Sequence, residues 1–349
     1  MSPKPPSLEQ ALSLPLVVFY GLGTTVGAGI YALTGKVAGV AGMHAPLSFL
    51  MAAALAGFTA LAFAELSSRL PYSAGEARFV ATAFNSHRIG LVIGLLVVLA
   101  GAVSSATIIN AFHGYLNDLI PIPRVPVVVA TVAALVALAC WGIRKSVSIA
   151  ALMTVIEIGG LVLIIAVAGD SFAELPRRWA EFVPPPPGEA WHGILFGSVL
   201  AFYAFIGFED IVNIAEEVPG ASRVLPTAIV LTLVLTTLLY FLVALVSVLS
   251  VPVERLAVSG APLVLVYTSG GGEVSAIINV IAFIAVINGA LIQIIMGARV
   301  LYGLARMNDL PAIFGHVHPR TRTPVVATGT IGAVVLVLAL FVPLIRLAE

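Results

Sequence analysis

The sequence predicts an all-α protein that crosses a membrane several times, and three observations lead to this fold class. Hydrophobic residues make up 60% of the 349 residues. A soluble domain of this length would carry roughly 87 charged residues, at about 25%, but this chain has only 17 basic and 17 acidic ones. Apolar runs of about 18 residues or more recur along the chain, each long enough to cross a bilayer core as a helix.

The same composition excludes other classes of protein. The net charge is zero, which removes the broad basic surface of a nucleic-acid binder, so no nucleic-acid partner is expected. Cys140 is the only cysteine, so neither a disulfide framework nor a cysteine-based metal site is expected. The chain has no HExxH helix and no Ser-His set, so we expect no enzyme, no catalytic residues, no cofactor and no metal. The lipid bilayer is the first partner that the sequence predicts.

Nine spans are expected where apolar runs lie between polar segments. In chain order they cover residues 13–42, 45–68, 88–117, 124–142, 147–168, 191–216, 225–250, 274–306 and 325–346. The first span follows a short polar lead with no cleavage site, so we expect it to be retained. Residues 1–349 are therefore expected to form a single membrane domain.

The distribution of Lys and Arg predicts the orientation in the membrane. With the N-terminus inside, the inner segments hold 11 of these residues and the outer segments hold 6. We therefore expect a multi-pass protein of the plasma (inner) membrane with a cytoplasmic N-terminus.

The first span contains a glycine-rich stretch near its middle, with four glycines within nine residues: Gly21, Gly23, Gly27 and Gly29. Each glycine costs about 1 kcal/mol relative to alanine in a helix interior, which favours unwinding. Gly23 and Gly27 also form a GxxxG pair, so close helix packing is the open alternative.

The sixth span leads directly from an apolar run into Glu209 and Asp210. A charge at the centre of a continuous membrane helix costs about 2.5–3.5 kcal/mol. A break at Ile206 and Gly207 would place both acids in the first turn of a second half-helix, where free N–H groups and the helix dipole stabilise them. Capping of that half-helix is the favoured role of both acids, and direct contact with a substrate or proton is the alternative.

Breaks in spans one and six predict a five-helix unit used twice, with residues 13–168 as the first repeat and 191–349 as the second. Unwound backbone inside a membrane is tolerated only where it lines a cavity or binds a ligand. The N–H groups freed at the first break suit a carboxylate, and the carbonyl groups freed at both breaks suit an ammonium group. An α-amino acid carries both groups. The N–H candidates are Gly27, Ala28 and Gly29, and the carbonyl candidates lie near Thr25, Tyr203, Ala204 and Ile206.

Four sequence blocks between residues 14 and 326 resemble signatures of the amino acid, polyamine and organocation (APC) superfamily of transporters. They are GLGTTVGAGIYALTG, AELSSRLPYSAGE, FYAFIGFEDIVNIAEEVPGASRVLP, and ARVLYGLARMNDLP followed by HPRTRTP. The resemblance implies a leucine-transporter-like fold, an inverted repeat of five plus five helices with discontinuous first and sixth spans. It also implies a permease for amino acids or related amines that works by alternating access, as a proton-coupled symporter or an exchanger.

The resemblance also implies the binding residues. Gly27, Ala28 and Gly29 are expected at the substrate carboxylate. The residues expected around the substrate amino group are Thr25, Val26, Tyr203, Ala204, Phe205, Ile206 and Gly207.

The number of spans departs from this family, because the fold needs a tenth helix and only nine spans are expected here. The sequence is expected to be either a truncated product or an unusual family member. A transport-inactive sensor or partner subunit with the same fold is therefore the alternative function.

Span five contains a single charged residue, Glu157, on a helix face of small and polar residues that should point into the bundle. In sodium-coupled relatives of this fold, a cation lies between spans one, five and eight. The resemblance puts Glu157 where some sodium-independent members have a lysine, with Asn288 of span eight beside it. Because burial disfavours the charged carboxylate, our hypothesis is that Glu157 carries the coupling proton and Asn288 is its hydrogen-bonding neighbour. A purely structural carboxyl group and a sodium ligand remain the alternatives.

Overall fold

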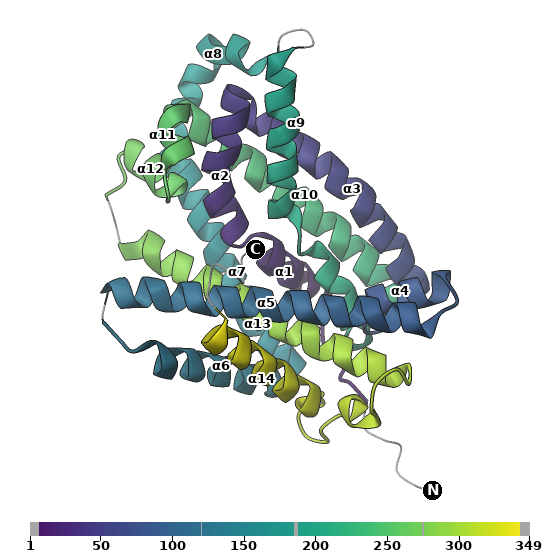
Figure 1. Cartoon of the computed structure of the whole chain (residues 1–349). Coiled ribbons are helices and arrows are strands. Elements are labelled where there is room, and N and C mark those ends of the chain that lie inside the picture. The colour runs from purple at the N-terminus through teal and green to yellow at the C-terminus, as the bar shows by residue number, and fades with distance from the viewer. Residues whose placement is uncertain (1–6, 120, 185–187, 274–275, 343–349) are drawn as a thin grey trace, which may run out of the picture.

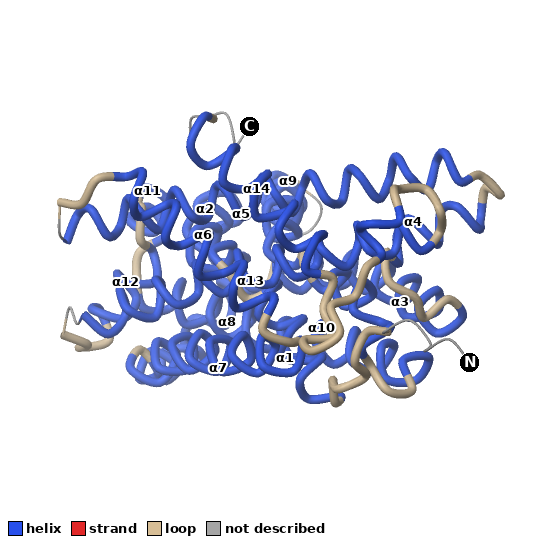
Figure 2. The backbone as a smooth tube through the Cα atoms, turned by 90° about the horizontal axis from the view of Figure 1, so that it is seen from below, coloured by secondary structure: helices blue, strands red, loops and turns tan. Residues whose placement is uncertain are grey.

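The structure is a computed structural model that describes residues 7–119, 121–184, 188–273 and 276–342. Every regular element in these ranges is a helix, and the long helices cross one another in a bundle (Figures 1 and 2). The predicted all-α class is therefore confirmed.

Seven of the expected spans are continuous helices. They are α3 (Ala45–Arg69), α5 (His87–Leu119), α6 (Arg124–Cys140), α7 (Ile143–Val167), α10 (Ala221–Ser250), α13 (Ala276–Arg306) and α14 (Val325–Phe341). Most boundaries agree with the expected ones to within a few residues, and residues 343–346 of the expected ninth span lie outside the described residues.

The other two expected spans are interrupted, as the sequence predicts. Span one consists of α1 (Leu14–Thr25) and α2 (Ala28–Ala41), and span six consists of α9 (Glu189–Phe202), η3 (Tyr203–Phe205) and η4 (Phe208–Glu217). The second half of span six is a 3₁₀ helix rather than the expected α-helix.

Several short helices in the connections are not among the expected elements, because each is too brief to produce a helical period in the sequence. They are η1 (Gly42–His44), α4 (Gly75–Ala83), η2 (Gly169–Glu174), α8 (Leu175–Phe182), α11 (Val253–Val258), α12 (Pro262–Ser269) and η5 (Ala312–Gly315). Helix α4 connects α3 to α5, and α11 with α12 connects α10 to α13, so the corresponding connection of each half contains short helices.

Helices from the two predicted repeats pack against each other, since α3 runs along α10 and α5 runs along α13. On α3, small side chains recur every four residues and are buried: Ala52, Ala56, Ala60 and Ala64. Small residues at this spacing lie on one helix face and let two helices approach closely. This buried face of small residues lets α3 pack closely within the bundle.

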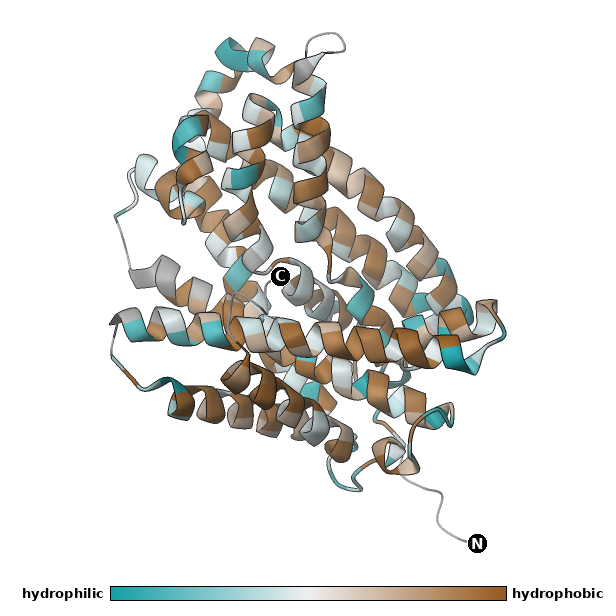
Figure 3. Cartoon of the chain, viewed as in Figure 1, coloured by the Kyte–Doolittle hydropathy of each residue, from teal (hydrophilic) through white to brown (hydrophobic). Residues whose placement is uncertain are grey.

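The outward faces of the long helices are apolar. Leu55, Phe58 and Leu61 of α3 are exposed, Phe58 to 75%, and Figure 3 shows hydrophobic residues along most of the bundle, with hydrophilic ones gathered at places such as α8. In water such a surface would cause association. Within the described residues, six helical stretches are long and apolar enough to cross a membrane, and α1, α6 and α14 are shorter apolar helices.

Candidate substrate and coupling sites

The first break separates α1 from α2 at Val26 and Gly27. Val26 has φ −85° and ψ 59°, and Gly27 is extended, with φ −108° and ψ −150°. No side chain caps the start of α2, and the first N–H groups of a helix have no partner within it. The donors that the sequence assigns to a carboxylate, at Gly27, Ala28 and Gly29, thus lie at an uncapped helix start.

The second break lies between η3 and η4. Ile206 is extended, and Gly207 has φ +129°, a conformation that residues with a Cβ rarely adopt. A Cβ at Gly207 would also lie 2.8 Å from the carbonyl carbon of Thr24. Only glycine fits this turn and this close approach to α1.

The two breaks are in direct contact. The Thr24 hydroxyl donates to the Gly207 carbonyl at 2.7 Å, and a Cβ at Gly29 would lie 3.2 Å from the Cα of Ala204. The Tyr240 hydroxyl of α10 lies 2.6 Å from the Thr25 carbonyl oxygen and 3.0 Å from that of Ala204. Tyr240 therefore bridges the breaks.

This bridge changes one expectation from the sequence. The carbonyl groups of Thr25 and Ala204 were expected to be free for an ammonium group, but both lie within hydrogen-bonding distance of the buried Tyr240 hydroxyl and share its single proton. A buried carbonyl without a partner is costly. A tyrosine in the middle of an apolar span was the only signal in the sequence for this role.

A cavity of about 400 Å³ opens beside the breaks. From the breaks it is lined by Thr24, Tyr203, Ile206 and Gly207, and from α5 its walls include Ser104. The other expected binding residues, namely Thr25, Val26, Gly27, Ala28, Gly29, Ala204 and Phe205, do not line it. Phe205 lies away from the cavity because its side chain is buried against Tyr240, with the two ring centroids 5.1 Å apart.

Three carboxyl groups line this cavity, from Glu76, Glu209 and Asp210. Glu209 accepts the Gly207 N–H at 2.8 Å, which is the capping contact expected at the start of the half-helix. Asp210 instead accepts the side-chain amide of Gln293 at 2.8 Å. The two neighbouring acids therefore have different partners.

Sequence reasoning missed Glu76 as a site residue. It lies in the SAGE segment at the start of α4, where nothing local indicates that the connection folds back to the break. One carboxylate oxygen accepts the Asn213 amide at 3.2 Å, and the other is buried without a partner among the described residues. Burial raises the pKa of Glu76 to about 7, with a further contribution from the nearby Glu209 carboxylate.

The proposed coupling residues lie next to the first break, on the side of α7 and α13. Glu157 is fully buried and accepts the Asn288 amide at 3.0 Å, and this amide also donates to Thr154 at 3.0 Å. The second oxygen of Glu157 and the side-chain oxygen of Asn288 have no partner among the described residues. A Cβ at Gly23 would lie 2.4 Å from the Thr154 hydroxyl, so the glycine brings α1 against this cluster.

Comparisons with known proteins agree with this architecture. The sequence matches the family described as amino acid permease over residues 12–348. It is 32% identical to cationic amino acid transporter 4, vacuolar, of Arabidopsis thaliana, over 99% of this chain and 60% of that protein. It is 28% identical to the branched-chain amino acid permease BcaP of Bacillus subtilis, over 98% of this chain and 77% of that protein. The chain spans 56% to 60% of the length of three Arabidopsis relatives.

Two solved structures are similar in fold. The structure of MhsT in complex with L-phenylalanine has a TM-score of 0.64 at 21% identity and covers 95% of this chain and 79% of its own. A Na⁺-coupled sialic acid symporter has a TM-score of 0.58 at 12% identity, over 95% of this chain and 75% of that one. The predicted leucine-transporter-like fold is thus confirmed, and the relatives are named as transporters and permeases rather than enzymes. By its sequence and its fold, the chain belongs to the amino acid permease family of the APC superfamily.

Proposed function

We propose that this protein is a secondary transporter of amino acids that works by alternating access. The observation that carries the proposal is the contact of two broken spans beside a cavity of about 400 Å³. The N–H groups at the uncapped start of α2, close to this cavity but outside its lining, suit a substrate carboxylate, and the extended backbone at Ile206 suits an amino group. The names of the relatives support amino acids as the substrate class.

A cationic amino acid or amine is the substrate we favour. Three carboxyl groups, from Glu76, Glu209 and Asp210, line the cavity, and it has no basic residue in its lining among the described residues. A cationic side chain would offset the negative charge of these carboxylates. The names of three relatives, which are called cationic amino acid transporters, support this preference. Competition between labelled arginine and unlabelled leucine tests it, because BcaP is named a branched-chain permease. Inhibition by leucine but not by lysine would contradict the preference.

Glu157 is the group that we propose couples transport to protons, with Asn288 as its partner. A fully buried carboxyl group that lacks a basic partner is more stable when protonated, and the free oxygen of Glu157 can hold that proton. The Thr154 hydroxyl donates to the Phe19 carbonyl at 3.2 Å, which links this cluster to α1 about two helical turns before the break. Loss or gain of the proton would therefore act next to the segment that must move.

Proteoliposome uptake of labelled arginine tests the function and the coupling together. We expect an inside-alkaline pH gradient to drive uptake by the unmodified chain, and Glu157→Gln to abolish that dependence. Glu65→Gln is the matched control, because Glu65 lies in an exposed ion pair with Arg69. Full dependence on the pH gradient in Glu157→Gln would contradict proton coupling, and uptake driven by sodium would assign the site to a sodium ion. Binding without any uptake would support the sensor or partner-subunit function instead.

We also propose a plasma (inner) membrane location with a cytoplasmic N-terminus. The excess of Lys and Arg on that side, 11 against 6, supports it. Protease protection of a tag at the N-terminus in right-side-out vesicles tests the orientation, and cleavage of that tag would contradict it.

A further inference from the structure

A second cavity, of about 520 Å³, lies where the segment before α1 meets α4, α10 and the end of α13. Its described lining shares no residue with the cavity beside the breaks. It lies on the face of the molecule that carries the N-terminal segment, the face that we expect to be cytoplasmic.

Two arginines line this second cavity, Arg78 of α4 and Arg306 at the end of α13. Neither makes an ion pair with any described residue. The Arg78 guanidinium stacks 4.4 Å above the ring of Tyr72, and its Nε is buried without a hydrogen-bond acceptor among the described residues. A buried donor on a charged group is costly to leave unpaired, so an anionic acceptor at the Nε of this half-buried arginine would be favourable.

The start of α10 lines the same cavity through Gly220, Ala221 and Ser222. Gly220 occupies the N-cap with φ +65°, no side chain caps the helix, and no acid lies in its first turn. The first N–H groups of this 30-residue helix and its positive dipole end therefore face the cavity without an anionic partner from that turn. Helix starts of this kind bind phosphate groups elsewhere.

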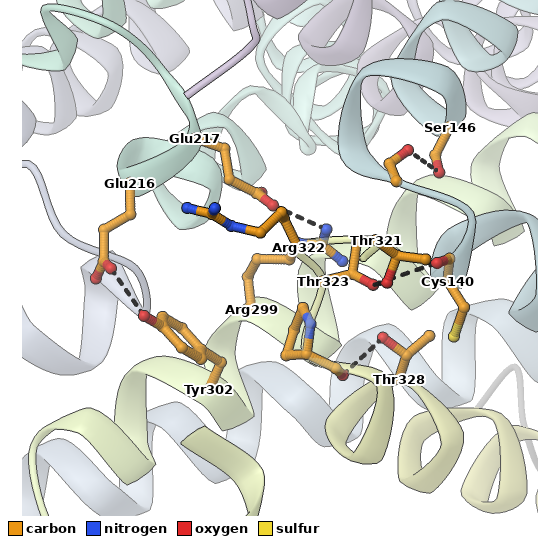
Figure 4. A network of polar contacts seen from close by, with 12 residues as sticks. Cys140, Ser146, Glu216, Glu217, Arg299, Tyr302, Thr321, Arg322, Thr323 and Thr328 are labelled. Carbon is orange, nitrogen blue, oxygen red and sulfur yellow. Dashed lines mark hydrogen bonds and ion pairs between the residues drawn. The ribbon is translucent and has the colours of Figure 1, made fainter. Parts of the chain in front are cut away.

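One acid, Glu216, also lines the cavity, but its oxygens already have partners. One accepts the Ser73 N–H at 3.2 Å and the other accepts the Tyr302 hydroxyl at 3.1 Å, a contact visible in Figure 4. The described lining thus contains one carboxylate, which is already hydrogen-bonded, together with two arginines and an uncapped helix start. The balance of charge in the cavity favours an anion.

We propose that this cavity binds a phosphate-type oxyanion, held by Arg78, Arg306 and the first N–H groups of α10. Arginine forks and helix N-termini both match the geometry of phosphate oxygens. The oxyanion could come from a free phosphate in solution or from a phospholipid headgroup, and both sources share this chemistry. Ser7 and Gln10 also line the cavity, so the bound anion would contact the segment that leads into α1.

Thermal unfolding of the purified full chain tests the proposal. Inorganic phosphate is added to protein in detergent, with sodium chloride at matched ionic strength as the control for screening. In a second arm, phosphatidylglycerol is titrated into the protein in the same phospholipid-free detergent. We expect one of the two phosphate sources to raise the melting temperature by mass action.

Three arginine variants decide whether this effect comes from the cavity. Arg306→Gln and Arg78→Gln should each weaken the apparent affinity about tenfold, the effect of losing one charged hydrogen bond. Arg88→Gln is the matched control, because Arg88 is exposed at the start of α5 and does not line the cavity, and it should bind as the unmodified chain does.

The pattern across the two arms identifies the source. A shift with inorganic phosphate supports a soluble ligand, and a shift only with phosphatidylglycerol supports a lipid headgroup. No shift in either arm, or equal losses in Arg306→Gln and Arg88→Gln, would overturn the proposal. Arg306 is exposed, so its substitution leaves the buried packing intact even if Arg78→Gln lowers stability.

Discussion

The acids inside the bundle differ in the partner that each one has, and the partner determines what each can do. Glu209 accepts a backbone N–H and so fixes the start of η4. Among the described residues, Glu157 accepts a hydrogen bond from the neutral amide of Asn288, and its other oxygen has no partner there and can take a proton. Glu217 accepts two hydrogen bonds from the Arg299 guanidinium and so forms half of a buried ion pair. At the scale of single residues, the same carboxyl group therefore serves as a cap, a proton site or half of an ion pair.

Glu76→Gln should change how stability depends on pH. Burial raises the pKa of Glu76 to about 7 from an ordinary 4.5, so the folded state holds this proton more tightly than the unfolded state does. The stabilisation of the folded state by this bound proton is fully present below about pH 4.5 and is lost as the pH rises to about 7. We expect the melting temperature of the unmodified chain to fall between about pH 4.5 and 7, and that of Glu76→Gln to fall less over the same range. Equal slopes for the two proteins would contradict a raised pKa at Glu76.

At the scale of elements, each interrupted span depends on a glycine at its break. In span six the turn at Gly207 interrupts the helix, packs on Thr24 and starts η4 with its acids in the first turn. In span one Gly29 lets α2 contact Ala204. Because both contacts leave little room for a Cβ, the breaks hold each other in place.

Gly207→Ala should lower both stability and uptake. The alanine would be strained at φ +129° and would press on the Thr24 backbone, at a cost of about 1–3 kcal/mol for the backbone conformation alone. Gly159→Ala is the matched control, because no described atom lies within 4 Å of the position that its Cβ would occupy, and it should keep or raise the melting temperature. Thermal unfolding and arginine uptake measure the two effects, and unchanged values for Gly207→Ala would contradict the role of the turn.

At the scale of the whole molecule, a buried ion pair joins η4 to α13 near the N-terminal segment. Arg299 donates twice to Glu217, both at 3.0 Å, and both side chains are fully buried. The backbone carbonyl of Glu217 also accepts the N–H groups of Ala11 and Leu12. Residues from three distant parts of the chain thus meet at one acid.

Glu217→Gln should destabilise the folded chain by about 3–5 kcal/mol, the cost of leaving one buried charge uncompensated. The double variant Glu217→Gln with Arg299→Met should recover part of that loss, because no buried charge remains. Glu174→Gln serves as the control, since its pair with Arg177 is exposed, and should have almost no effect. Denaturation of all three variants measures the differences, and a loss no larger than that of the control would show that the buried pair contributes little.

Much of the candidate site could be predicted because its signals are local. The glycines of span one, and the acids that follow the apolar run of span six, break the ordinary pattern of a membrane helix and so mark both interruptions. Glu157 is visible as a lone charge in an apolar span, and the structure places Asn288 beside it. Glu76 and Tyr240 could not be found in this way, because their roles depend on which distant atoms they meet.

By itself, the sequence determined the membrane environment, the all-α class and the positions of both breaks, because hydropathy, span length and glycine content act within one segment of chain. Only the tertiary structure decided that the Tyr240 hydroxyl contacts the carbonyl oxygens of Thr25 and Ala204. It also decided that three acids line one cavity, and that Arg78 and Arg306 line another cavity together with the start of α10. Most of these outcomes depend on contacts between segments that lie far apart in the chain. No local pattern encodes them, since each requires two or more helices to be placed against one another before the side chains can meet.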